Sequence, residues 1–437
     1  FGDIRPRGSN ITNNGKSNGS FAFTKLFEAT IDTISQGTSR KGMFAGYIDI
    51  DHGDIEEWLD IHTEGNPIQL MYYGVCVSHE WLESMKAGDP YKRQIWAKLL
   101  QRKTETGIPY IFFKDNANTG RPDVYKDRNM MIHASNLCSE IALPSSEDES
   151  FVCCLSSMNL LYFDEWKDTD APEVLTYFLD IVMSEFIAQS ANIQFMDKAN
   201  KFARRHRALG LGVLGWHSYL QSKNMAFDSF EAMQHNNMIF KLLQEKTLKA
   251  SKELAQRFGE PEILKGYGRR NTTLMSVAPT KSSSFILGSV SPSIEPFKSN
   301  YYVKDLSKIK VVYKNPFLEA LLKRKGLDRD DIWESILLND GSVQHLTELT
   351  EDEKEVFKTF SEISQLSVIQ QAAQRQKYID QGQSVNIMVH PATPVKDLNQ
   401  LYLTAEELGL KSIYYQYSMS AAQVFNRNLL NCSSCEG

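Results

Sequence analysis

The stretch Ser135-Asn136-Leu137-Cys138-Ser139-Glu140-Ile141-Ala142-Leu143-Pro144 is the part of the sequence around which the rest is organised. If it is extended, side chains alternate between faces, so Asn136, Cys138 and Glu140 share one face. A thiol between a hydrogen-bonding amide and a possible base is an arrangement for chemistry. The alternative is a half-buried strand with a structural cysteine. These residues alone favour that alternative slightly.

Composition restricts the class of protein. The chain has 437 residues, of which 42% are hydrophobic and 23% charged, as in ordinary globular proteins. A net charge of -6 and the lack of a Lys/Arg run argue against a nucleic-acid surface. No apolar run is long enough to span a bilayer, and no signal-peptide pattern is present. Six cysteines in so long a chain do not form a secreted disulfide framework, so we expect a cytoplasmic protein.

Hydrophobic periodicity predicts helices that alternate with short apolar strands. The predicted helices cover residues 21–34, 79–87, 91–106, 171–190, 199–222, 228–258, 315–338, 351–362, 364–381 and 395–408. The predicted strands cover residues 108–113, 273–278, 384–389 and 411–417. This alternation predicts an α/β architecture on a largely parallel sheet or barrel.

The segment Gly210-Leu211-Gly212-Val213-Leu214-Gly215 matches G-x-G-x-x-G literally. We reject a dinucleotide site there, because the segment follows the basic residues 204–207 and no predicted strand. Close helix packing explains these glycines better.

Two patterns concern redox and metal chemistry. Cys432-x-x-Cys435, on a polar tail, favours thiol–disulfide exchange over zinc binding, which would need two more ligands. His52 alone lies in an acidic pattern, Asp49-x-x-His52, and no second such motif exists. We therefore predict no metal site on this chain, and interpret Asp49, Asp51, His52 and Asp54 as surface charge.

Two loops are candidate phosphate cradles, although each signal is weak alone. The loop from Ser35 to Gly42 contains glycines beside Arg40 and Lys41. The hydroxyl-rich turn at 279–284 follows a predicted strand and contains a lysine, but a capped helix N-terminus would look the same.

Tyr414-Tyr415 lies in a predicted strand. Adjacent strand residues face opposite sides, so the two rings share a pocket only if the backbone bends or two layers meet there. Core packing is the usual role of such a pair, and electron transfer is the more specific alternative.

Taken together, these segments resemble the large (catalytic, alpha) subunit of class I ribonucleotide reductase. Residues 136–144 are similar to the finger loop at the centre of that family's ten-stranded α/β barrel. The order of the other segments also agrees: 4–9, 35–42, 204–215, 279–283, 294–296, 414–416 and the cysteine-pair tail. The resemblance implies a barrel over 1–419, lacking its N-terminal portion, and a flexible redox tail over 420–437.

The resemblance implies reduction of ribonucleoside diphosphates to 2′-deoxyribonucleoside diphosphates by a thiyl radical. Cys138 would become the thiyl and abstract the 3′-hydrogen, Glu140 would be the base on the 3′-hydroxyl, and Asn136 would orient the ribose. Leu137 and Ser139 of the same loop would also line the substrate site. Cys153 matches one cysteine of the reducing pair, whereas the adjacent Cys154 is expected to take no part in the reaction.

The resemblance also implies other binding and transfer roles. The substrate diphosphate would bind Pro279, Thr280, Lys281, Ser282 and Ser283. Tyr414 and Tyr415 would relay a radical from a separate small (beta) subunit that carries a dinuclear metal cofactor. Cys432 and Cys435 would re-reduce the active-site disulfide and be recharged by thioredoxin or glutaredoxin.

A specificity site is implied as well. A deoxynucleoside triphosphate or ATP would bind at the interface of an alpha dimer, against Arg5, Ser35, Gln36, Gly37, Arg40 and Lys41. We expect Gln36 and Arg40 to transmit its signal.

The chain departs from the family at its start, where the family has a region that holds the other active-site cysteine. We therefore expect a companion chain to supply that part. One alternative is an adenosylcobalamin-dependent class II reductase, against which the tyrosine pair argues. Another is a non-catalytic nucleotide-binding regulatory subunit, against which the joint presence of Asn136, Cys138, Glu140 and Cys153 argues.

Overall fold

A computed structural model describes residues 1–35, 42–306, 309–390 and 393–418. Helices and strands alternate along these residues, so the predicted α/β class is confirmed. Several residues with predicted roles lie outside the described residues: Gln36, Gly37, Arg40, Lys41, Cys432 and Cys435.

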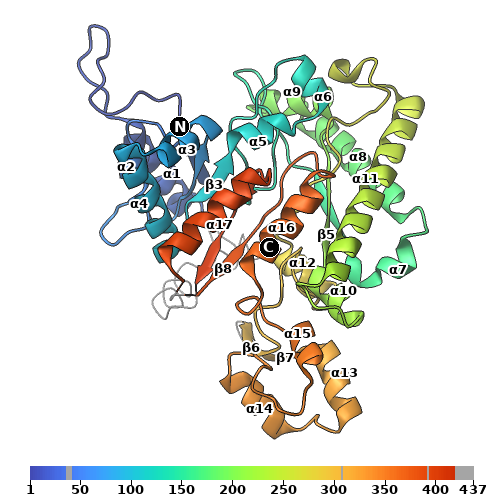
Figure 1. The fold of residues 1–437 in the computed structure, drawn as a ribbon. Helices are drawn as coiled ribbons and strands as arrows, with labels where there is room; N and C mark the ends of the chain where they lie inside the picture. Colours follow the sequence, from blue (N-terminus) through green and yellow to red (C-terminus); the bar gives the residue numbers. More distant parts are fainter. Residues whose placement is uncertain (36–41, 307–308, 391–392, 419–437) are drawn as a thin grey trace.

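One group of strands lies in the N-terminal part of the fold. Strands β1 (Ala45–Asp49), β2 (Tyr72–Val77) and β3 (Tyr110–Phe113) are parallel neighbours, and β9 (Ser412–Ile413) pairs antiparallel with β3. Every residue of β2 and β3 is buried, as is typical of parallel strands covered on both faces. The covering helices are α1 (Ser20–Ile34), α2 (Ile55–Trp58), α3 (His79–Ala87) and α4 (Pro90–Thr106), seen in blue in Figure 1.

A second group of strands continues the barrel. Strands β4 (Leu155–Asn159) and β5 (Gly210–Leu214) are parallel, and single parallel bridges continue through Leu211–Met275 and Val277–Gln383. Strands β8 (Ile387–Val389) and β10 (Gln416–Ser418) are also parallel. The Tyr414 backbone N–H donates to the Val385 carbonyl (2.8 Å), which joins the two groups.

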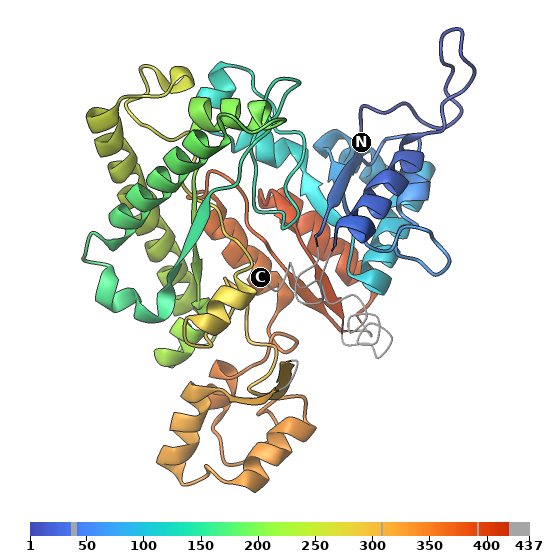
Figure 2. The ribbon, with the colours of Figure 1, turned by 180° about the vertical axis from the view of Figure 1, so that it is seen from behind.

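Helices surround this second group. They are α5 (Lys114–Thr119), α6 (Asp123–Asp127), α7 (Phe163–Trp166), α8 (Ala171–Ser190), α9 (Asp197–His206), α10 (Trp216–Ser222), α11 (Phe230–Phe258), α12 (Lys281–Ile286), α16 (Gln365–Gln376) and α17 (Val395–Glu407). In Figures 1 and 2, α8 and α11 lie side by side on the outside of the molecule. No helix among the described residues is long and apolar enough to cross a membrane.

The single helix predicted over 199–222 is wrong, because α9, β5 and α10 occupy that range. β5 lies between β4 and the bridge at Met275, and all its residues are buried. A Cβ on Gly212 would lie 2.3 Å from the Ser276 carbonyl oxygen. The glycines of this segment therefore allow close approach of strands, and not helix packing.

The prediction of surface charge is wrong for His52 and Asp54, which are both buried. The Asp54 carboxylate accepts hydrogen bonds from the Arg7 N–H (2.7 Å) and from the N–H and hydroxyl of Ser20. Burial alone would raise the pKa of Asp54, but these hydrogen bonds lower it below its usual value. Asp54 thus fastens the N-terminal loop to the start of α1.

A separate lobe is formed by residues 301–356. It contains the hairpin β6 (Tyr301–Leu306) and β7 (Ile309–Lys314), followed by α13 (Pro316–Lys325), α14 (Asp330–Leu338) and α15 (Glu351–Val356). The predicted helix over 315–338 is thus two helices, because α13 ends at Gly326 with φ +69°. Thr350 and Glu353 form a capping box at the start of α15. Figure 2 shows the lobe projecting from the barrel.

Candidate active site

The segment 136–140 is a turn and not the predicted extended strand. Ser139 has φ +65°, and the Asn136 side-chain oxygen accepts a hydrogen bond from the Ile141 N–H (3.1 Å). This bond closes a compact loop, because a short polar side chain competes well for a nearby backbone N–H. The strict alternation of faces is therefore wrong for Asn136, Cys138 and Glu140.

Side chains and backbone from four parts of the barrel hold this loop by its carbonyl groups. The Tyr47 hydroxyl donates to the Asn136 carbonyl (2.8 Å), and the Ser412 hydroxyl donates to the Ser139 carbonyl (2.8 Å). The Glu140 carbonyl accepts from the Ser276 hydroxyl (2.9 Å) and from the Gly382 N–H (2.7 Å). A Cβ on Gly382 would lie 3.0 Å from that last carbonyl oxygen. The barrel thus holds the loop at the carbonyl groups of Asn136, Ser139 and Glu140.

Ser384 brings the two reactive candidates together. Its hydroxyl lies 2.5 Å from the Cys138 carbonyl oxygen and 3.4 Å from Glu140 Oε2. Glu140 is buried, whereas Cys138 and Asn136 are half-buried. The loop therefore presents a thiol and an amide beside a carboxylate held in the protein interior.

The adjacent cysteines Cys153 and Cys154 have different environments. Cys153 is exposed, yet the dense protein around it and the nearby Glu140 charge raise the pKa of its thiol. Cys154 is half-buried and its thiol donates to the Leu179 carbonyl of α8 (3.5 Å). Burial raises the pKa of Cys154 to about 11. Only Cys153 therefore combines solvent access with the electrostatic influence of Glu140.

Tyr414 and Tyr415 connect β9, which pairs with β3, to β10, which pairs with β8 in another sheet. Their ring centroids lie 4.3 Å apart, so the two rings are in contact where these two groups of strands meet. Tyr414 is fully buried and Tyr415 half-buried.

Three further tyrosines surround this pair and were not identified from the sequence. The hydroxyls of Tyr110 and Tyr415 lie 2.9 Å apart, and the Tyr110 ring is 4.7 Å from that of Tyr414. The Tyr72 and Tyr417 rings each lie 6.1 Å from the Tyr415 ring, from β2 and β10. Tyr110 and Tyr417 lie within predicted strands, where core packing explains them equally well, and Tyr72 lies outside every predicted element.

The turn 279–283 leads into the short helix α12, and Thr280 has φ +50°. The Thr280 hydroxyl accepts from the Ser293 N–H (2.8 Å) and lies 3.0 Å from the Ser284 hydroxyl. The Lys281 ammonium lies 5.3 Å from the centre of the Tyr417 ring, so the turn approaches the tyrosine cluster. A helix start without a side-chain cap is compatible with phosphate binding.

Of the predicted effector residues, Arg5 and Ser35 are described. Arg5 is exposed, and its carbonyl accepts from the Ser17 hydroxyl (3.1 Å). Ser35 follows α1, and its hydroxyl oxygen accepts from the Gly42 N–H (3.1 Å). Among the residues that the structure describes, no group of three or more His, Cys, Asp or Glu side chains could hold a metal ion.

The chain matches a family model described as "Ribonucleotide reductase, barrel domain" over residues 1–93, 90–263 and 260–416. It is 33% identical to a putative ribonucleoside-diphosphate reductase large subunit of Frog virus 3, covering 97% of this chain and 80% of that protein. It is 38% identical to the large subunit of Invertebrate iridescent virus 3, covering 79% of this chain but 56% of that protein.

A solved structure, that of the Actinobacillus ureae class Id ribonucleotide reductase alpha subunit, is 80% identical to this chain with a TM-score of 0.91. The match covers 99% of this chain and 78% of that one.

Proposed function

This chain belongs to the ribonucleotide reductase family and is an oxidoreductase of the catalytic large-subunit type, and we propose that Cys138, Glu140 and Asn136 carry its chemistry. Cys138 is the thiyl radical that removes the 3′-hydrogen of a ribonucleoside diphosphate. Glu140 accepts the proton of the 3′-hydroxyl, and the Asn136 amide nitrogen orients the ribose. The Ser384 hydroxyl supports this assignment, since it contacts the Cys138 carbonyl oxygen and the Glu140 carboxylate and so places the two residues beside one another.

Loss of the 2′-hydroxyl as water requires two electrons and two protons. Oxidation of two thiols to a disulfide supplies both. We assign Cys153 to this pair, because it is exposed and lies near enough to Glu140 for that carboxylate to raise the pKa of its thiol. Cys154 bonds to α8 and Cys76 is buried against the His133 carbonyl (3.4 Å), so neither is assigned.

The remaining steps use Tyr414, Tyr415 and the C-terminal cysteines. The contact between the two rings supports a relay of the radical from a small subunit with a dinuclear metal cofactor. Cys432 and Cys435 would restore the active-site thiols, and thioredoxin or glutaredoxin would recharge them. The companion chain proposed for the second cysteine remains a prediction.

The nucleotide-binding roles complete the proposal. The turn Pro279–Ser283 binds the substrate diphosphate through the N–H groups at the start of α12 and through Lys281. Arg5 and the loop from Ser35 bind a nucleoside triphosphate effector at the interface of an alpha dimer. The class Id description of the 80% identical structure supports class I for this chain.

The test uses the holoenzyme, with the large and small subunits assembled. We expect Cys138→Ser to abolish reduction of ribonucleoside diphosphates while substrate binding persists. Cys154→Ser, which also replaces a thiol sulfur by oxygen, should retain most of the activity. Normal turnover in Cys138→Ser would eliminate the thiyl assignment. Turnover that required adenosylcobalamin and proceeded without a small subunit would favour class II instead.

A further inference from the structure

Lys103, in the last turn of α4, is fully buried behind the tyrosine pair. Its Nζ donates to the Tyr414 carbonyl (2.6 Å) and to the Pro109 carbonyl (2.8 Å). Pro109 directly precedes Tyr110, so the Lys103 side chain joins Tyr414 to the start of β3.

A buried lysine is costly unless its nitrogen is satisfied. No ion pair joins Lys103 to a carboxylate within the described residues, and burial lowers its pKa well below the usual value. Both carbonyl acceptors lie within hydrogen-bond distance of Nζ, so two backbone groups satisfy the buried nitrogen. Lys103 therefore links the residues before β3 to Tyr414.

The rest of the α4 terminus holds the same segment from the other side of Tyr415. The Gln416 side chain donates to the Thr104 hydroxyl (3.0 Å), and the Gln416 N–H donates to the Gly107 carbonyl (3.1 Å). A Cβ on Gly107 would lie 3.1 Å from the Gln416 carbonyl oxygen, so the two backbones approach closely. Residues 414–416 are thus fixed at both ends by one helix turn.

We propose that Lys103 is a positioning residue of the radical relay, which holds Tyr414 in contact with Tyr415 and Tyr110. This inference rests on the relay role proposed above for the tyrosine pair. Electron transfer between side chains weakens steeply with their separation, and the rings of Tyr414 and Tyr415 are 4.3 Å apart. Lys103 is hydrogen-bonded to the carbonyl that links these two residues.

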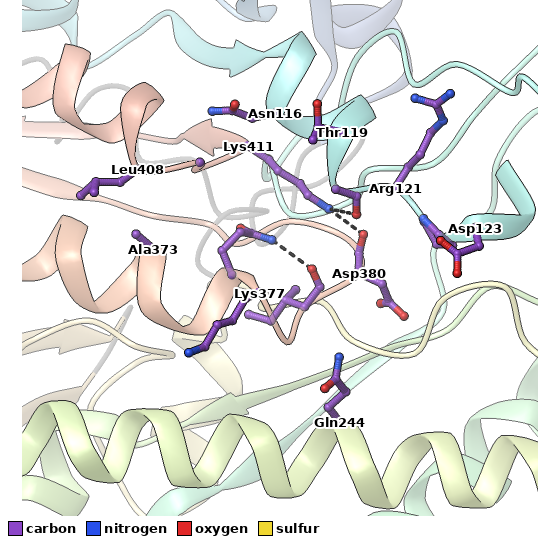
Figure 3. A pocket seen from close by; sticks show the side chains of 15 residues that line it. Asn116, Thr119, Arg121, Asp123, Gln244, Ala373, Lys377, Asp380, Leu408 and Lys411 are labelled. Carbon is purple, nitrogen blue, oxygen red and sulfur yellow. Dashed lines mark hydrogen bonds between the residues drawn. The ribbon is translucent and has the colours of Figure 1, made fainter. Parts of the chain in front are cut away.

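Lys411 provides a matched control. It too is buried, and its Nζ donates to two carbonyl groups, those of Gly120 (3.1 Å) and Asp380 (2.7 Å). Figure 3 shows it beside a pocket of about 530 Å³ that is lined by α5, α16 and the end of α17. Lys411→Met and Lys103→Met each leave two carbonyls without a donor, so their costs in stability should be similar.

The test compares these variants in the holoenzyme. We expect Lys103→Met to lower kcat about tenfold to 100-fold with KM unchanged, as small misplacements of reacting groups do. Lys411→Met should keep kcat within about twofold, since no reacting group depends on it. With 3-aminotyrosine as a radical trap, Lys103→Met should reduce radical yield at position 414 and not at position 415.

Two outcomes separate this inference from the proposed function. Activity in Tyr414→Phe would overturn the relay itself. Inactive Tyr414→Phe with normal turnover in Lys103→Met, or equal kcat losses in the two Met variants, would overturn the positioning role alone. If Lys103→Met fails to fold, Lys103→Gln, which keeps an N–H₂ group too short to reach both carbonyls, is judged by the same criteria.

Discussion

Glu149 is a buried carboxylate that connects the segment after the finger loop to α9. It pairs with Arg205, and His206 Nε2 lies 3.4 Å from its Oε2. The other nitrogen of His206 lies 3.0 Å from the Tyr125 hydroxyl, which donates to Thr272. Hydrogen bonds from His206 and from Arg205 lower the pKa of Glu149 from 4.5 to about 2, against the effect of burial.

This lowered pKa predicts a pH-dependent effect of Glu149→Gln. A carboxylate with a lowered folded-state pKa stabilises fully above its unfolded value, and the contribution is lost as pH falls toward the folded value. We expect the substitution to lower the free energy of unfolding by about 2 kcal/mol at pH 7. The difference from the wild type should shrink between about pH 4.5 and pH 2, measured by urea unfolding.

Asp148→Asn is the control, because Asp148 is exposed and its contact with Lys201 is 3.5 Å long. It should change stability little at either pH. An equal loss for Glu149→Gln at both ends of the pH range would mean that packing, and not charge, dominates at this position.

At the residue scale, the sequence identified the reactive candidates but not the residues that hold them. Asn136, Cys138 and Glu140 lie within one motif, so local order was enough to select them. Ser384 contacts Cys138 from 246 positions away, and Tyr47 contacts Asn136 from 89 positions away. A serine at the start of a predicted strand carries no local sign of such a partner.

At the scale of elements, prediction succeeded where helices have one polar face and clear ends. The predicted helix over 91–106 is α4, whose N-terminus is capped by Asp89 and whose end is Gly107 with φ +86°. It failed at β5, because an element buried on every side has no periodicity to distinguish strand from helix. The glycines there were assigned to the wrong kind of contact for the same reason.

The close approach at β5 predicts a large effect of Gly212→Ala. The new Cβ would meet the Ser276 carbonyl oxygen at 2.3 Å and the Val277 Cα at 3.2 Å, and these are backbone atoms. The strand or its neighbour must shift, so we expect a loss of about 3 kcal/mol or more in the free energy of unfolding.

Gly42→Ala is the control, since its nearest contact would be the Ser35 hydroxyl at 3.6 Å. It should be nearly neutral in the same thermal or urea unfolding experiment. A Gly212→Ala protein as stable as the wild type would show that β5 has room to move, which would weaken the account of the barrel's close strand spacing.

At the scale of the whole molecule, the described residues contain separate hydrophobic cores. The main core lies in the barrel, and another lies in the lobe, around Leu318, Leu322, Trp333 and Ile336. Polar contacts join lobe and barrel: the Asn315 amide donates to Gln221 of α10 (2.9 Å), and the Gln221 amide donates to the Val356 carbonyl (3.2 Å). The sequence did not indicate this division, because the predicted helix over 315–338 continued the α/β alternation without a break.

Two leucine truncations of equal burial test whether the lobe is a separate cooperative unit. Leu322 lies in the lobe core and Leu243 of α11 lies in the main core, and both are fully buried. Each change to alanine should cost about 2–5 kcal/mol. Because the lobe has a hydrophobic core of its own, Leu322→Ala should increase hydrogen exchange in the lobe and leave β2 and β3 protected. Leu243→Ala should instead weaken protection across the barrel.

If Leu322→Ala accelerated exchange in β2 and β3 as much as in α13, lobe and barrel would unfold as one unit.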